Sequence, residues 1–281
     1  DVVNKQIGCA FMPHPPIMIP EVGKYELHKI KATVDGAEEV AKVLKECNPQ
    51  TIVIITPHGP VFQDAATISI HPRLRGSLAN FGVPEVSLGF ETDGLLARHI
   101  IKKCERLGVP LLELTDDLAK TYRLSLGLDH GAMVPLYYFH KAGFKGQLVH
   151  LTVGMISYEE MYTFGKAVQA AIEMTDKRVV VIASGDLSHR LLPGAPAGFS
   201  PRAAEFDQQI VAALGQADLK ALLNIDRELI EEAGECGLRP AFFLMGVLGG
   251  QDVNAEVLSY EGPFGVGYAV VQFLVNQNKG E

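Results

Sequence analysis

Three histidines occupy equivalent places in the sequence. His14, His58 and His189 each follow a short run of apolar or β-branched residues and lie among the Pro, Gly and Ser residues of a turn. Neutral imidazole is the commonest metal ligand, and it exchanges protons near neutral pH. Ligands of open α/β sheets bind outside the carboxyl ends of the strands. Histidines in these positions therefore indicate one shared site for metal binding or proton transfer.

Further residues extend this candidate set. His130 lies in a similar loop-like stretch, and Asp186 precedes His189 by three residues, where it could orient that imidazole or bind a metal. Two histidines and one carboxylate form the facial triad of non-haem Fe(II) oxygenases. Glu235, which lies close to two glycines and precedes an apolar helix, is the predicted carboxylate, with a solvated helix end as its alternative interpretation. The other five histidines are expected to have only structural roles: His28, His71, His99, His140 and His150.

Alternating strand and helix patterns must position these residues. Strand-like runs cover 7–12, 51–56, 67–70, 148–153, 178–183 and 266–275. Helical periodicity covers 35–47, 93–107, 158–174, 203–223 with an interruption at 215–216, and 240–248. This alternation indicates a sheet with helices on its faces, and the continuous Val/Ile runs indicate central strands buried on both sides. No Gly-, Pro- or Ser-rich linker divides the chain, so we expect one α/β domain over residues 1–281.

Composition excludes several classes of protein. The 281 residues are 47% hydrophobic and 21% charged, which is ordinary for a soluble globular domain. No apolar run reaches the ~18 residues of a membrane span, and a net charge of −8 without a basic block argues against nucleic acid as a partner. The four cysteines form no CxxC pair, which excludes a zinc ribbon. Because the cysteines are few and no signal-peptide pattern is present, we expect a cytoplasmic protein.

Five segments together resemble the class III extradiol ring-cleavage dioxygenases, the LigB-like proteins, and their relative Memo. In chain order they are 12–16 (MPHPP), 55–60 (ITPHGP), 128–136 (LDHGAMVPL), 183–189 (ASGDLSH) and 234–237 (GECG). The resemblance runs through nearly the whole chain. It implies a single α/β domain with a central mixed β-sheet flanked by helices.

The resemblance also implies an activity and its residues. Fe(II) would be held by His14, His58 and Glu235, and a small catecholic substrate would react with O2 in a pocket lined by His130 and His189. His189 is the expected acid–base residue, and His130 is expected to hydrogen-bond to substrate oxygens. The formation of a homo-oligomer stays open.

Two features depart from a ring-cleavage enzyme. Cys236 lies in a Cys-Gly-x-x-Pro pattern in which Memo-like proteins use the cysteine as a metal ligand, and a thiolate favours zinc or copper. The segment 259–268 (SYEGPFGVGY) resembles the Memo-related branch. A Memo-like metal-binding protein without ring cleavage and a zinc-dependent hydrolase are therefore the alternatives. Since neighbouring residues rarely reach one metal, we predict Glu235 as the ligand and Cys236 as a small buried residue.

Overall fold

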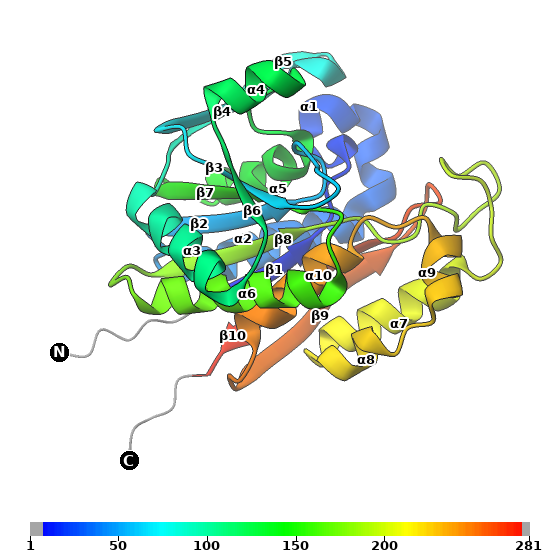
Figure 1. Ribbon diagram of the computed structural model, residues 1–281. Helices are drawn as coiled ribbons and strands as arrows, with labels where there is room; N and C mark the ends of the chain where they lie inside the picture. Colours follow the sequence, from blue (N-terminus) through cyan, green and yellow to red (C-terminus); the bar gives the residue numbers. More distant parts are fainter. Residues whose placement is uncertain (1–7, 277–281) are drawn as a thin grey trace.

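An eight-stranded mixed β-sheet forms the centre of the molecule in a computed structural model that describes residues 8–276 (Figure 1). From one edge to the other its strands are β6 (Leu111–Leu114), β3 (Ala66–Ser69), β7 (Gln147–Thr152), β2 (Thr51–Thr56), β8 (Val179–Ser184), β1 (Gly8–Met12), β10 (Tyr268–Val275) and β9 (Val253–Glu261). Strands β7, β2, β8 and β1 run parallel. At the flanks, β10 is antiparallel to β1, and β3 is antiparallel to β7.

Helices cover both faces of this sheet (Figure 1). On one face lie α1 (Pro20–Gly23), α2 (Lys31–Glu46) and α5 (His130–Lys141), together with the 3-10 turns η1 (Pro16–Met18) and η2 (Lys24–Ile30). On the other face lie α3 (Gly94–Leu107), α6 (Tyr158–Glu173), α7 (Ala203–Gly215), α8 (Leu219–Leu223), α9 (Arg227–Ala233) and α10 (Leu238–Leu248). The predicted single α/β domain with a mixed central sheet is confirmed, although the ends of the predicted range 1–281 lie outside the described residues.

Local sequence accounts for most element boundaries. Every residue of β2 and β8 is buried, as their Val/Ile runs predict. The Asp93 side chain caps α3 by accepting a hydrogen bond from the N–H of Leu96, and Gly108 ends that helix in the left-handed conformation. The helical stretch 203–223 is interrupted where the sequence predicts it, since α7 ends at Gly215, α8 begins at Leu219, and Ala217 adopts a positive φ between them.

Several elements were not expected from sequence patterns. A separate hairpin consists of β4 (Arg73–Leu78) and β5 (Val83–Glu91), joined by the 3-10 turn η3 (Ala79–Phe81), and α4 (Asp116–Tyr122) follows β6. Helix α5 contains Pro135 and is buried almost all round, so it has no amphipathic period to detect. Strands β6 and β9 lie at the two edges of the sheet, where partial exposure removes the continuous apolar run.

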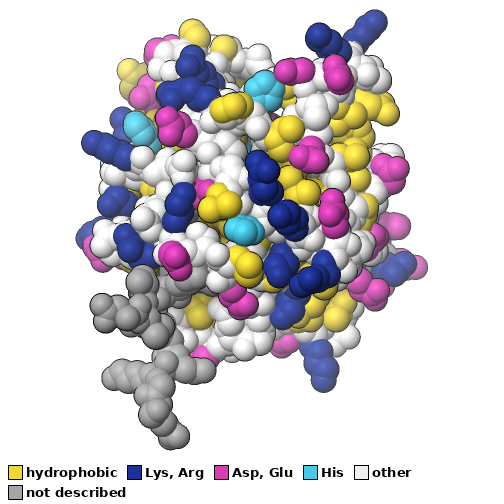
Figure 2. Space-filling view, turned by 60° about the vertical axis from the view of Figure 1, so that its left-hand side comes forward, with side chains coloured by type: hydrophobic (Ala, Val, Ile, Leu, Met, Phe, Trp, Pro, Cys, Tyr) yellow, Lys and Arg dark blue, Asp and Glu magenta, His cyan; other side chains and the backbone are white. Residues whose placement is uncertain are grey.

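The molecular surface in view carries charges of both signs. On the face seen in Figure 2, Lys and Arg side chains are interspersed with acidic and hydrophobic ones. Within residues 8–276, no helix combines the length and the apolar character required to cross a bilayer.

The strand order brings the predicted site residues together. Strands β2, β8 and β1 are adjacent and parallel, so their carboxyl ends meet at one edge of the sheet. His58 follows β2, Asp186 follows β8, and His14 follows β1. Segments that are far apart in sequence thus present their loops to one small region.

Candidate metal centre

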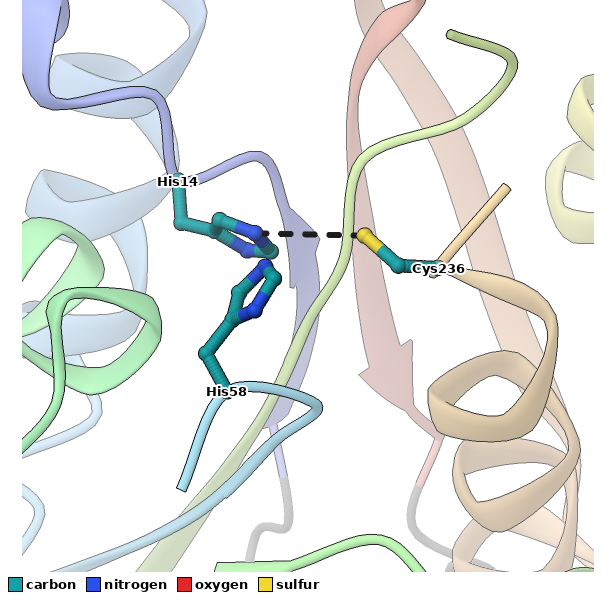
Figure 3. Close-up of side chains that lie close together, drawn as sticks. All are labelled: His14, His58 and Cys236. Atoms are coloured by element: carbon teal, nitrogen blue, oxygen red, sulfur yellow. Dashed lines mark hydrogen bonds between the residues drawn. The ribbon is translucent and has the colours of Figure 1, made fainter. Parts of the chain in front are cut away.

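Three side chains converge at this edge of the sheet: His14, His58 and Cys236 (Figure 3). One potential ligand atom of each lies within 4.8 Å of those of the other two, and His14 Nε2 is 3.9 Å from Cys236 Sγ. His14 is buried, Cys236 is half-buried and His58 is exposed, so the cluster is closed on one side and open at His58. Two imidazoles and a thiol form a donor set that fits a first-row metal ion and leaves open positions.

Hydrogen bonds fix the tautomer of His14. The Ser184 hydroxyl donates its proton to the carbonyl oxygen of Gly131 at 2.5 Å. Its oxygen must therefore accept from His14 Nδ1, which lies 2.9 Å away. The proton of the neutral ring then resides on Nδ1, and the lone pair of Nε2 faces Cys236. This is the orientation in which a histidine ligates a metal through Nε2.

Asp186 joins the loop after β8 to the loop that carries Cys236. Its N–H donates to Cys236 Sγ at 3.3 Å, its carbonyl accepts from the N–H of Cys236 at 3.3 Å, and its Oδ1 accepts from the N–H of His14 at 3.0 Å. A Cβ on Gly185 would lie 2.6 Å from Gly237 Cα, so only glycines allow these two segments to approach so closely. Asp186 is thus placed to support His14 and Cys236, and no hydrogen bond joins it to His189 within the described part of the chain.

The electrostatics favour neutral imidazoles and proton release on metal binding. Burial, together with the charge of His130, lowers the pKa of His14 to about 3. Burial and the charge of His14 lower the pKa of His58 to about 4. Burial also raises the pKa of the Cys236 thiol and of the Asp186 carboxyl. A bound cation would oppose that rise by stabilising the thiolate and the carboxylate.

His130 and an aromatic side chain adjoin the open side of the cluster. The His130 ring stacks on His58 with centroids 4.5 Å apart, and it meets His14 edge-on at 5.5 Å. Phe81, from the turn of the β4–β5 hairpin, contacts His130 edge-on at 5.5 Å and remains 41% exposed. The row of rings from Phe81 to His14 gives the opening an aromatic wall.

His189 lies beside this cluster but does not belong to the three converging ligands. Its N–H donates to the carbonyl of Ala233, which holds the loop after β8 against the end of α9. Its charge influences the pKa of both Asp186 and His14. Its Nδ1 is buried and has no hydrogen-bond partner among the described residues. A buried polar atom without a partner requires an explanation, and a reacting proton or an absent ligand supplies one.

The structure does not place Glu235 with the two histidines. The Glu235 carboxylate accepts a hydrogen bond from the N–H of Leu238 at 2.6 Å, at the start of α10. The chain emerges from α9 through Gly234 in the left-handed conformation, so Glu235 is directed to the helix start and Cys236 toward His14. The structure thus groups Cys236, and not Glu235, with the two histidines, and the identity of the third metal ligand stays a prediction.

Two polar residues that support the cluster were not predicted from sequence patterns. Ser184 is the last residue of β8 and orients His14. His150, expected to be only structural, is buried at β7 and lies 3.0 Å from the Asp129 carboxylate. A histidine inside an otherwise apolar strand is the signal that could have identified the second, because a buried imidazole needs polar partners.

A buried carboxyl group supports the His189 loop and makes stability depend on pH. Asp207 Oδ1 accepts from the N–H of Ser188 at 2.9 Å, and Oδ2 accepts from the Tyr260 hydroxyl. Burial raises the pKa of Asp207 from 3.8 to about 6. Its contribution to stability is therefore fully present below the unfolded pKa and is lost as the pH rises through about 6.

We expect Asp207→Asn to remove this pH dependence. From about pH 4 to about pH 8, the free energy of unfolding of wild type should fall relative to the variant by about 2–3 kcal/mol. Urea unfolding of both proteins across this pH range measures the difference between their free energies of unfolding. Groups that titrate in both proteins contribute equally, so their effect cancels in this difference. If the free energies of unfolding of the two proteins changed with pH in parallel, the pH dependence would not come from Asp207.

Three known proteins are similar to this chain over 80% or more of its length. A protein of Clostridium acetobutylicum is 39% identical over 271 residues, which are 96% of this chain and 58% of that protein, so the chain spans little more than half the length of this relative. The 3,4-dihydroxyphenylacetate 2,3-dioxygenase of Escherichia coli is 26% identical over 82% of this chain and 84% of its own. A MEMO1 family protein of Thermococcus kodakarensis is 29% identical over 80% and 76%, respectively.

Structural similarity supports the fold alone. An uncharacterized protein of Escherichia coli K12 superposes with a TM-score of 0.61 at 17% identity, covering 94% of this chain and 98% of that one. The model of the catalytic LigB subunit of aromatic ring-opening dioxygenase matches residues 8–271. The resemblance seen in the sequence is thereby confirmed, and the chain belongs to the LigB family.

Proposed function

We propose that this protein is a metal-dependent, extradiol-dioxygenase-like enzyme that opens the ring of a catecholic substrate with O2. The observation that carries the proposal is the convergence of His14, His58 and Cys236 at the carboxyl edge of the sheet, within a LigB-family chain. The similarity to a dioxygenase of a dihydroxylated aromatic acid supports this substrate class.

The open side of the site suits a flat aromatic ligand. His58 is exposed, His130 stacks on it, and Phe81 extends the aromatic surface outward. Aromatic pairs contribute about 0.5–1.5 kcal/mol beyond the burial of their area. These rings would orient a catechol with its two hydroxyl groups toward the metal ligands and its ring toward Phe81.

Each residue has a separate task in the proposed reaction. When bound, the metal ion would act as a Lewis acid that lowers the pKa of a substrate hydroxyl. His189 Nδ1, which has no partner in the described part of the chain, would take up the released proton. His130 would donate a hydrogen bond to a substrate oxygen. Asp186 would hold His14 and the Cys236 loop in place.

The Cys236 thiol favours a second candidate function. Family membership supports Fe(II), but a thiolate with two imidazoles also suits zinc. A Memo-like metal-binding protein without ring cleavage would fit such a zinc site, as the MEMO1 family relative suggests. A zinc-dependent hydrolase with the same ligands would differ from it by turning over an ester or amide.

Metal analysis combined with oxygen uptake separates these functions. The protein is purified without oxygen, its metal content is measured, and O2 consumption is recorded with a panel of catechols. Bound iron with catechol-dependent O2 uptake supports the dioxygenase. Tightly bound zinc without O2 uptake contradicts it and leaves the Memo-like protein and the hydrolase, which a panel of ester substrates distinguishes.

A further inference from the structure

A buried chain of polar groups lies beside the metal cluster. The Thr56 hydroxyl donates to Asp129 Oδ2 at 2.6 Å, and the other carboxylate oxygen, Oδ1, lies 3.0 Å from His150 Nε2. The opposite ring nitrogen, His150 Nδ1, lies 2.8 Å from Ser69 Oγ. The side chain of His150 is 2% exposed and that of Asp129 is 11% exposed. Four residues on β2, β3, β7 and the start of α5 are thus joined in one network.

The position of Asp129 is not explained by helix capping. It precedes α5 at the position where an aspartate usually accepts from the helix N–H groups, but its side chain makes no such bond. Asp93, in the same position before α3, does accept from the N–H of Leu96 at 3.1 Å. The Asp129 carboxylate instead faces two side-chain donors. Hydrogen bonds to these donors favour its charged form, and they lower its pKa to about 2 against the opposing effect of burial.

The network leads directly to two histidines of the site. Thr56 Oγ1 gives its proton to Asp129 and accepts from the N–H of His58 at 3.1 Å. The donors and acceptors of these two hydrogen bonds are therefore fixed: the His58 N–H donates to Thr56, and Thr56 donates to the Asp129 carboxylate. A Cβ on Gly131 would lie 2.2 Å from Thr56 Oγ1 and 2.9 Å from Asp129 Oδ2. Only glycine lets the first turn of α5, which begins at His130, approach the network this closely.

We propose that Asp129 and Thr56 are positioning residues of the metal centre. Asp129 orients the Thr56 hydroxyl, Thr56 holds the backbone of His58, and the same carboxylate sets the start of α5 so that the His130 ring lies over His58. His150 and Ser69 hold the carboxylate from behind. This inference rests on the proposed metal site. It adds that the imidazole of His58 is held in place through its backbone.

Removing the Thr56 hydroxyl isolates this effect. Thr56→Val keeps the shape of the side chain but leaves the N–H of His58 and the Asp129 carboxylate without this partner. We expect Zn(II) affinity, measured by competition with a chromophoric chelator, to fall about 10- to 100-fold, the usual effect of losing an outer-shell partner. The visible absorption of Co(II) bound at the site should change as well. Thr56→Ser, which keeps the hydroxyl, should restore both measurements.

Thr67 provides a matched control on strand β3, which β7 separates from β2 in the same sheet. Its hydroxyl is buried and has no partner among the described residues, so Thr67→Val makes the same substitution without breaking a hydrogen bond. This variant should bind Zn(II) like wild type. If Thr56→Val does not fold, Thr56→Ala removes the same hydroxyl without placing a methyl group against the carboxylate and carries the same expectation.

The outcomes separate this inference from the proposed function. If wild type binds one Zn(II) per chain and the valine or alanine variant binds it equally well with an unchanged Co(II) spectrum, the positioning role is wrong. Equal losses in the serine variant would contradict it too, because the hydroxyl would then be irrelevant. If wild type binds no metal, the proposed metal function fails instead.

Discussion

Replacing Cys236 with Ala should abolish stoichiometric metal binding, whereas replacing Glu235 with Gln should leave it intact. The thiol sulfur lies 3.9 Å from His14 Nε2, and it completes the three-residue cluster with His58. The Glu235 carboxylate is engaged with the N–H of Leu238, a bond that a glutamine oxygen can also accept. The metal-loaded protein should therefore show a metal–sulfur distance near ~2.3 Å in X-ray absorption.

A second buried thiol controls for general effects of losing a cysteine. Cys104 is a free, buried cysteine on the core-facing side of α3. Cys104→Ala should keep one metal ion per chain and lose only packing stability. His14→Ala should behave like Cys236→Ala, since it removes another member of the cluster. A Cys236→Ala protein with full metal content, together with a Glu235→Gln protein without metal, would reinstate the carboxylate as the third ligand.

Much of the fold follows from local sequence. The run from Thr51 to Thr56 is both predicted and observed as a strand with the same bounds, because six consecutive β-branched residues suit a strand buried on both faces. The hairpin of β4 and β5 was missed, since β4 mixes exposed arginines with buried leucines in a short, irregular pattern. The order of strands in the sheet is set by long-range packing, for which one sequence holds no local signal.

Some features of the candidate site could also be predicted from local sequence, and others could not. His14, His58 and His130 could be placed at one edge of the sheet because each adjoins a strand end or a helix start, and ligands bind at carboxyl ends of strands. The preference for Glu235 over Cys236 rested on the ligand chemistry of Fe(II), because no sequence pattern shows the direction of the backbone after Gly234. Adjacent residues point to different sides, so one left-handed residue exchanges their roles.

His189→Ala should separate metal binding from turnover. His189 lies outside the three converging ligands, so the variant should keep its metal. Its buried Nδ1 has no partner in the described part of the chain, which suits a group that accepts a proton from the substrate. We expect catechol turnover to fall about 10²–10⁴-fold, the usual size of a general acid–base effect.

His140→Ala is the matched control, because His140 is exposed near the end of α5. It should keep both metal and turnover. Loss of metal from His189→Ala would place His189 among the ligands, with the buried Nδ1 as its coordinating atom. Unchanged turnover would remove His189 from the chemistry altogether. In that case His130, which stacks on His58 at the open side, would be the remaining imidazole able to accept the proton from a bound catechol.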